Sequence, residues 1–209
     1  MQQLNIDYYF APQSPWAYLG HQRFSRIARQ HGCEVRVLPI DVGEVFPASG
    51  GLALPKRAPQ RQAYRLQELK RFSEHLALPL NLHPRHFPVA GDDAARLIIA
   101  VDIHDGSDAA LQLAGDVFES VWCRESDIAS EFVLAQLLHD AGLAAQRLID
   151  AVHPDVQRRY ESNTAQAIAS NVFGVPTYKL GNELFWGQDR LDFLERKLRR
   201  SEGLDDMSQ

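Results

Sequence analysis

Cysteine is scarce in this chain of 209 residues, which contains only Cys33 and Cys123. The two lie far apart in the sequence, and no C-x-x-C pair occurs. This spacing argues against a disulfide framework and against a zinc site. His83 and His86 lie among prolines that prevent a helix and lack an adjacent acidic or thiol residue, so we predict no metal site. We interpret both cysteines as small buried apolar side chains.

Long apolar runs and excess positive charge are also missing. No run approaches the roughly 20 residues that span a bilayer, and the start, MQQLNIDYYF, lacks the basic and apolar regions of a signal peptide. The net charge of −5 argues against general nucleic-acid binding. Hydrophobic residues make up 45% of the chain, which suffices for a core. The sequence predicts a soluble cytoplasmic protein that binds neither nucleic acid nor membranes.

The N-terminal part predicts a β-α-β unit. Residues 4–10, LNIDYYF, are rich in aromatic and β-branched side chains, which indicates a buried strand. A helix is predicted from Pro15 to about His31, because apolar residues recur at helical spacing. They are Trp16, Leu19, Phe24, Ile27 and Ala28. Residues 34–40, EVRVLPI, predict a second strand, joined to the first by a right-handed parallel crossover.

The middle of the chain predicts helices and the end returns to strands. Residues 41–58 predict a loop, because they are rich in glycine and proline. Helices are predicted at 59–76, 91–105, 107–124, 129–141, 145–151 and 154–171, with an extended proline-containing connection at 77–89. VFGVPTYKL and NELFWG flank Gly181-Asn182, which indicates a hairpin. A last helix is predicted from Asp189, as its N-cap, to Arg200, followed by a frayed tail, SEGLDDMSQ.

This order predicts an α/β fold of the thioredoxin type. The β-α-β half and the β-β-α half form one thioredoxin-like domain from residues 1–58 and 172–209. The all-helical segment 59–171 is predicted to be an insertion domain between them.

The stretch Ser14-Pro15-Trp16-Ala17 lies where the first strand turns into the first helix. Serine followed by proline is typical of an N-cap and the first helical position. Exposed backbone amides at a helix N-terminus also favour an anion. Ser14 is therefore either the cap of an ordinary helix or a working residue in a site that handles sulfur.

The stretch Gly174-Val175-Pro176-Thr177 places a proline in an apparent strand. Proline cannot donate to a sheet ladder, so it belongs at an edge, a strand start or a bend. A cis peptide at Val175-Pro176 would leave the backbone of Val175 free to pair with a ligand. A simple strand-entry proline accounts for the sequence equally well.

Together these two stretches resemble the thioredoxin superfamily, in which a cis-proline turn faces the active-site helix. Members of its disulfide-oxidoreductase branch with a helical insertion often carry C-P-W-C where this chain has S-P-W-A. Thiol–disulfide exchange needs a thiolate, and Ser14 and Ala17 occupy both cysteine positions of this motif, so a disulfide oxidoreductase activity is excluded. Serine at the first position is similar to kappa-class glutathione transferases and 2-hydroxychromene-2-carboxylate isomerases. The resemblance covers DYYFAPQSPWAYLG, the pattern from Tyr64 to Arg71, SVWCRESDI and NVFGVPTYKLGNELFWGQDRLDFLE.

The resemblance implies glutathione as cofactor, a homodimer and a role for each matching residue. Ser14 would donate a hydrogen bond to the glutathione thiolate. Val175, which precedes Pro176, would pair through its backbone with the cysteinyl part of glutathione. Gln188 and Asp189 would hold the γ-glutamyl group, although Asp189 is also explained as a plain N-cap.

The segment LPKRAPQRQAY departs from the family pattern, which has an asparagine and a lysine that contact glutathione. Lys56 stands where the asparagine is expected and Arg61 where the lysine is expected. Arginine can replace lysine as a carboxylate partner, with a different, forked geometry. The surrounding Lys/Arg cluster is either a solvated helix face or an anion-attracting rim. We place Trp16 and Tyr64 in the substrate pocket, although Trp16 is also explained as a core residue.

The resemblance implies a glutathione-dependent isomerase of aromatic catabolism, acting on a small aromatic carboxylate. In the implied reaction 2-hydroxychromene-2-carboxylate becomes trans-o-hydroxybenzylidenepyruvate by thiolate addition, bond rotation and elimination. A kappa-type transferase that conjugates electrophiles and a non-catalytic glutathione- or peptide-binding protein remain as alternatives.

Overall fold

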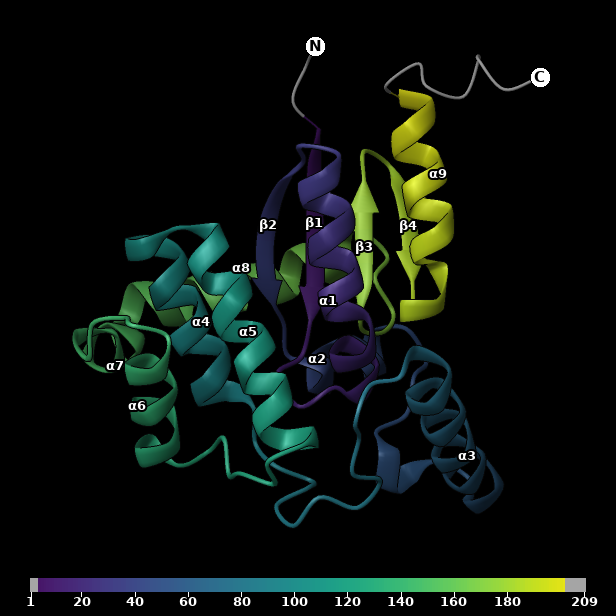
Figure 1. Ribbon diagram of the computed structural model, residues 1–209, viewed down its shortest axis with the longest axis horizontal. Coiled ribbons are helices and arrows are strands. Elements are labelled where there is room, and N and C mark those ends of the chain that lie inside the picture. The colour runs from purple at the N-terminus through teal and green to yellow at the C-terminus, as the bar shows by residue number, and fades with distance from the viewer. Residues whose placement is uncertain (1–3, 202–209) are drawn as a thin grey trace.

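The computed structural model describes residues 4–201, so most of the predicted frayed tail lies outside the described residues. A four-stranded sheet has the order β2-β1-β3-β4 (Figure 1). Its strands are β1 (Asn5–Phe10), β2 (Glu34–Pro39), β3 (Thr177–Leu180) and β4 (Glu183–Trp186). β2 runs parallel to β1, whereas β3 is antiparallel to both β1 and β4. The β-α-β and hairpin predictions are confirmed.

Different helices cover the two faces of the sheet. Because successive side chains of β1 point to opposite faces, they pack in two different clusters. Tyr8 and Phe10 lie in the core that α1 (Pro15–Gln30) and α9 (Leu191–Ser201) cover. Tyr9 lies in a second cluster with Val45 and Ala167, which belong to α2 (Val42–Ala48) and α8 (Pro154–Ala169). Figure 1 shows α1 and α9 on the near side of the sheet, with α8 behind it.

The helical segment is built from helices whose bounds agree with the prediction to within about two residues. They are α3 (Pro59–Leu76), α4 (Asp92–Asp105), α5 (Ser107–Trp122), α6 (Glu131–Asp140), α7 (Gln146–Ala151) and α8. Buried residues of α4 and α5 belong to the same hydrophobic cluster as those of β1 and α1. The sheet and the helical segment therefore share one core.

Two local predictions are wrong. Residues 41–58 are not all loop, since they contain α2 and the short 3₁₀ helix η1 (Leu54–Lys56). The Asp41 side chain caps α2 by accepting a hydrogen bond from the Gly43 amide at 2.6 Å, and this offsets the poor helix propensity of the segment. Asp189 is not the N-cap of the last helix, because it lies inside a 3₁₀ turn, η2 (Gln188–Arg190), that precedes α9.

Within residues 4–201, no helix is long and apolar enough to cross a bilayer.

Candidate functional site

Ser14 caps helix α1, as predicted. Its hydroxyl oxygen accepts a hydrogen bond from the Ala17 amide at 3.2 Å, and the residue is only 8% exposed. The first turn of α1 contains no acidic residue. Among the described residues the hydroxyl hydrogen has no acceptor, so Ser14 can cap the helix through its oxygen and donate through its hydrogen. A helix N-terminus with a free donor and no competing carboxylate is suited to an anion.

The Val175-Pro176 peptide bond is cis, so of the two interpretations of this turn the cis one is confirmed. β3 begins only at Thr177, and the Pro176 carbonyl accepts a hydrogen bond from the Gly187 amide at 2.9 Å. Within the described part of the chain, the main-chain N–H and C=O of Val175 have no hydrogen-bond partner. The turn therefore offers one free donor and one free acceptor to an extended ligand.

The sheet register brings this turn and Ser14 to the same edge. Tyr9, near the end of β1, pairs with Thr177 at the start of antiparallel β3. The chain segments that continue beyond this pair, toward Ser14 on one side and Pro176 on the other, therefore leave the sheet at the same edge. Two segments far apart in the sequence thus form one site.

Gln188 and Asp189 follow β4 at this edge. Gln188 is 2% exposed, and its side-chain nitrogen is buried without a hydrogen-bond partner. The Asp189 side chain is half-exposed and forms an ion pair with Arg190 at 2.8 Å. Gly187 has φ +102°, and a Cβ atom there would lie 2.5 Å from an Asp189 carboxylate oxygen. A side chain at Gly187 would therefore displace Asp189.

These groups fit a tripeptide thiol. Ser14 and the α1 N-terminus provide a place for a thiolate, and the free main chain of Val175 matches a peptide backbone. The unpartnered Gln188 nitrogen needs an acceptor, which a buried donor rarely lacks. Asp189 provides a negative charge suited to an ammonium group.

A glycine allows η2 to lie close to α1. A Cβ atom at Gly20 would lie 2.8 Å from the Cβ of Gln188 and 2.7 Å from the Tyr178 hydroxyl oxygen. We expect Gly20→Ala to lower the free energy of unfolding by about 1–3 kcal/mol, because overpacking outweighs the gain in helix propensity. Denaturant unfolding checks this, and an unchanged or raised stability would contradict it.

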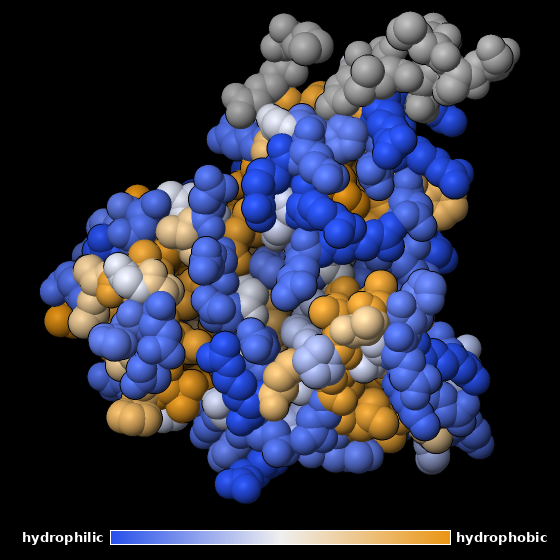
Figure 2. All heavy atoms as spheres, viewed as in Figure 1, coloured by the Kyte–Doolittle hydropathy of each residue, from blue (hydrophilic) through white to orange (hydrophobic). Residues whose placement is uncertain are grey.

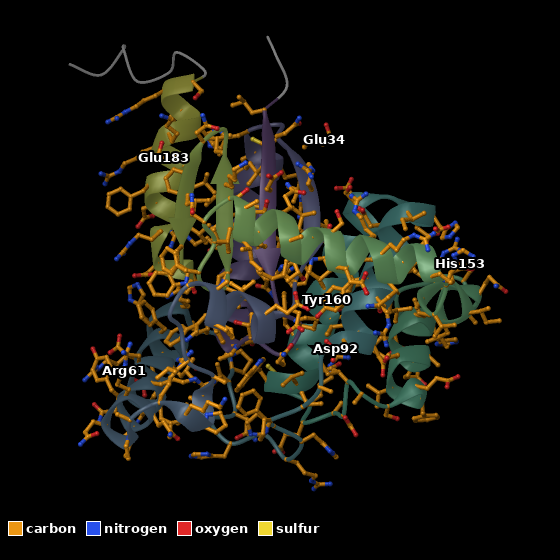
Figure 3. All side chains as sticks on the ribbon, turned by 180° about the vertical axis from the view of Figure 1, so that it is seen from behind. Glu34, Arg61, Asp92, His153, Tyr160 and Glu183 are labelled. Carbon is orange, nitrogen blue, oxygen red and sulfur yellow. The ribbon has the colours of Figure 1, made fainter. Side chains whose placement is uncertain are left out.

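Lys56 and Arg61 lie on the exposed surface of η1 and α3. Figure 3 shows Arg61 at the end of the molecule opposite His153. Neither side chain forms an ion pair or a side-chain hydrogen bond within the described residues. Both are therefore available to an anionic ligand, and their contact with glutathione stays a prediction.

The two aromatic residues predicted for the substrate pocket differ in position. Trp16 is half-buried and packs edge-on against Phe72 of α3, with ring centroids 5.9 Å apart. Tyr64 is 55% exposed, and the Arg71 guanidinium lies 5.8 Å from its ring centroid. Trp16 therefore lies between α1 and α3, and Tyr64 on the outer surface of α3. The pocket role of each stays a prediction.

Nothing in the sequence distinguishes Arg65 from the neighbouring basic residues. Its guanidinium lies 5.5 Å from the ring centroid of Phe87 and 5.9 Å from that of Trp122. Burial, with a contribution from the nearby charge of Arg57, lowers the pKa of Arg65 to about 10. Only the fold reveals this group, because its three members come from α3, the connection 77–91 and α5.

The cysteines are half-buried rather than fully buried, and both are free thiols. The Cys123 sulfur lies 3.0 Å from the Tyr18 hydroxyl and 3.2 Å from the Pro79 carbonyl oxygen. Burial raises the pKa of the Cys123 thiol. Cys123 is therefore a structural thiol. Over residues 4–201 no cluster of three metal-ligating side chains occurs.

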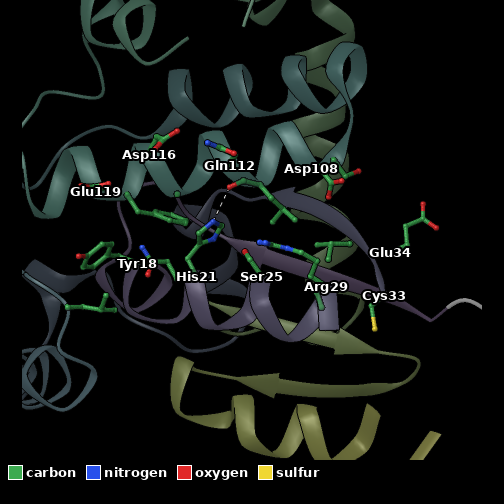
Figure 4. Close-up of a pocket in the computed structure, with 18 of the residues that line it drawn as sticks. Tyr18, His21, Ser25, Arg29, Cys33, Glu34, Asp108, Gln112, Asp116 and Glu119 are labelled. Atoms are coloured by element: carbon green, nitrogen blue, oxygen red, sulfur yellow. Dashed lines mark hydrogen bonds between the residues drawn. The ribbon is translucent and has the colours of Figure 1, made fainter. Parts of the chain in front are cut away.

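A cleft of about 980 Å³ lies between α1 and α5 (Figure 4). Its lining includes His21 and Ser25 of α1 and Gln112 and Asp116 of α5. None of the predicted site residues lines this cleft. The candidate site at the sheet edge is separate from it.

The model of the DsbA-like thioredoxin domain matches residues 5–199. A 2-hydroxychromene-2-carboxylate isomerase from Sphingobium xenophagum is 31% identical over 196 residues, which cover 92% of this chain and 97% of the relative. Glutathione S-transferase kappa 1 from Caenorhabditis elegans is 23% identical over 217 residues, which cover 96% of this chain and 93% of the relative. The solved structure of a 2-hydroxychromene-2-carboxylate isomerase superposes with a TM-score of 0.77 at 29% identity, covering 98% of this chain and 100% of that one. The chain therefore belongs to the DsbA-like thioredoxin family and, within it, to the family of 2-hydroxychromene-2-carboxylate isomerases and kappa-class glutathione transferases.

Proposed function

We propose that this chain is a glutathione-dependent isomerase that converts 2-hydroxychromene-2-carboxylate into trans-o-hydroxybenzylidenepyruvate. The observation that carries the proposal is Ser14, a buried N-cap with a free hydroxyl hydrogen, at the same sheet edge as the cis turn at Pro176. The relative from Sphingobium xenophagum and the solved structure both bear the name of this isomerase. The name of the nematode relative supports glutathione as the thiol.

The chemistry that glutathione supplies is a thiolate that adds to the activated double bond of the substrate and leaves again after the resulting single bond has rotated. Ser14 and the α1 N-terminus hold the sulfur in its ionised form. Val175 holds the peptide backbone of glutathione, while Gln188 and Asp189 hold its γ-glutamyl end. Lys56 and Arg61 attract carboxylates of glutathione or substrate. The isomerase belongs to the catabolism of aromatic compounds.

The test follows the ultraviolet spectrum of the chromene carboxylate with the protein, with and without glutathione. We expect interconversion that requires glutathione and leaves its concentration unchanged. Interconversion at equal rate without glutathione would contradict the proposal. Absence of thermal stabilisation by millimolar glutathione would also contradict it, since a ligand that binds only the folded state raises its stability.

A second candidate is a kappa-type transferase, favoured by the similarity to the nematode enzyme. The site would be the same, and only the fate of the thiol adduct would differ. Stoichiometric loss of glutathione with 1-chloro-2,4-dinitrobenzene, without isomerisation of the chromene, would support the transferase. Glutathione binding with neither reaction would support a binding protein.

We also propose that the protein acts as a cytoplasmic homodimer. The described surface carries exposed apolar side chains on the helical segment, Phe132 and Ile149 among them, that a second copy could cover. Sedimentation at micromolar concentration tests the dimer.

A further inference from the structure

We infer that Arg65 is the residue that binds the carboxylate of the aromatic substrate. The inference deepens the proposed function and rests on it for the identity of the substrate. The inference rests on a half-buried guanidinium that lies over two aromatic rings, 5.5 and 5.9 Å from their centroids, and has no anionic partner. We expect this group to select planar aromatic acids over neutral aromatic compounds.

The charge of Arg65 is uncompensated. Within residues 4–201 its side chain forms no ion pair and no hydrogen bond. The neighbouring cations add to the positive field, since Arg61 lies one helical turn away on α3 and the charge of Arg57 acts on Arg65. A partly desolvated cation without a counter-ion is costly, and an anionic ligand would remove that cost.

The two aromatic rings hold the guanidinium by cation–π contacts, while its N–H groups remain accessible. Phe87 and Trp122 pack on one another, with ring centroids 4.9 Å apart, and the guanidinium lies over both rings. None of its nitrogen atoms is among the buried polar atoms that lack a partner, so the N–H groups face accessible space. An arginine fixed in this way presents a preorganised fork to a carboxylate. The Trp122 indole nitrogen is buried without an acceptor, which adds a second unpaired donor to the same cluster.

Two structural connections join Arg65 to the thiolate site. On α3, Arg65 and Phe72 are two turns apart on one face, about 10 Å along the axis. Phe72 packs against Trp16, which lies in the first turn of α1 beside Ser14. Figure 2 shows apolar surface between α3 and the rest of the molecule.

The second connection is the segment that follows Phe87. It ends at Gly91, where a Cβ atom would overlap the side-chain amide of Gln13, the residue before Ser14. The Gln13 amide oxygen is itself buried without a partner. Trp16 and Phe72 on one path, and residues 87–91 on the other, therefore connect the surroundings of Arg65 with those of Ser14. A substrate with its double bond near Ser14 can place its carboxylate toward Arg65.

The experiment measures binding without turnover, so that it stays separate from the isomerase assay. Trans-2-hydroxycinnamate and its neutral amide are titrated into the glutathione-saturated protein by calorimetry. Wild type, Arg65→Met and Arg65→Lys are compared with Lys70→Met, which removes the same charge from the exposed face of the same helix. Methionine keeps an unbranched stem against the aromatic rings, and thermal unfolding verifies that each variant is folded.

We expect the wild type to bind the carboxylate about 10- to 100-fold more tightly than the amide, the range for a charged hydrogen bond. Arg65→Met abolishes this preference, Arg65→Lys keeps part of it, and Lys70→Met keeps all of it. A wild type without preference, or a preference that survives Arg65→Met, overturns the inference. If Arg65→Met does not fold, full preference in Arg65→Lys overturns it and partial preference supports it.

The two proposals fail in different ways. Absence of glutathione-dependent isomerisation, with the carboxylate preference intact and dependent on Arg65, overturns the function alone. Isomerisation that is unchanged in Arg65→Met, in both KM and kcat, overturns the role of Arg65 alone. With the expected result, KM for the chromene carboxylate rises at least tenfold in Arg65→Met and keeps the wild-type value in Lys70→Met.

Discussion

Replacement of Ser14 by alanine is expected to lower glutathione-dependent turnover by about 10²- to 10³-fold, the usual cost of losing one donor to a reacting anion. The hydroxyl hydrogen of Ser14 has no acceptor in the described structure, so alanine removes a donor that only a ligand can use. The same substitution removes the capping bond to Ala17, which costs about 1 kcal/mol of stability. The loss of activity is therefore expected to exceed the loss of stability.

The pH profile separates the two effects. A hydrogen bond to a charged group contributes about 1.5–3 kcal/mol, and one pKa unit corresponds to 1.36 kcal/mol. The acidic limb of the pH–rate profile should therefore move upward by about one to two pH units in Ser14→Ala, because the bound thiol ionises less readily. An unmoved limb together with unchanged turnover would contradict the role of Ser14.

His153→Ala serves as the matched control. His153 caps α8 by accepting a hydrogen bond from the Asp155 amide at 3.2 Å, and it lies in the helical segment, away from the sheet edge. Loss of this cap should reduce stability by a similar amount and leave both turnover and pH profile unchanged.

The second large effect concerns acid stability and His21. This residue is buried between β1 and α5, and burial lowers its pKa to about 4 from the ordinary value of 6.5. Its Nε2 lies 3.0 Å from the Leu111 carbonyl oxygen, which can only accept, so Nε2 carries the proton of the neutral ring. Protonation of Nδ1 would place a charge next to the Tyr8 ring in the core.

Stability decreases as the pH falls, because the pKa of His21 is lower in the folded protein than in the unfolded chain. Between pH 6.5 and pH 4 the unfolded chain binds a proton at His21 and the folded chain does not, so stability falls as the pH falls through this window. The shift of 2.5 pH units corresponds to about 3 kcal/mol. Above pH 6.5 this contribution is constant.

Chemical unfolding at pH 7 and pH 4.5 measures the effect. In His21→Leu the absolute stability is expected to fall, because the Leu111 carbonyl loses its donor, and the acid-dependent loss is expected to shrink by most of the 3 kcal/mol. His75→Gln, a change on the exposed surface of α3, should keep the wild-type pH dependence. An equal acid-dependent loss in His21→Leu and wild type would show that His21 is not its cause.

The β-α-β unit was predictable because aromatic and β-branched runs mark its strands, while Pro15 and the helical spacing of apolar residues mark its helix. The helix α2 was missed because Gly43 and Pro47 are typical of loops. Packing stabilises the helix nevertheless, since Val45 is fully buried against the sheet in the cluster that contains Tyr9. Here tertiary contacts outweighed local propensity.

The site was predictable only in part, because only some of its residues have a local sequence signature. Ser14 has a local signature, a cap followed by proline, whereas the isomer of the Val175-Pro176 bond has none that separates cis from trans. Arg65 looks like any basic residue on a helix surface. Its difference from Arg61 and Lys70 arises only when Phe87 and Trp122 are brought beneath it, and such long-range contacts leave no periodic pattern in the sequence.

The shared core of the sheet and the helical segment determines how cooperatively the protein unfolds. Leu97 and Phe118 of α4 and α5 are fully buried in the cluster that also contains Tyr8 and Phe24. Excision of residues 59–171 would remove the α4 and α5 side chains that pack in this cluster, together with α8 from the other face of the sheet, and would expose the apolar side chains that they cover. The two parts should therefore unfold in a single cooperative transition. A shortened chain that lacks residues 59–171 should not fold stably.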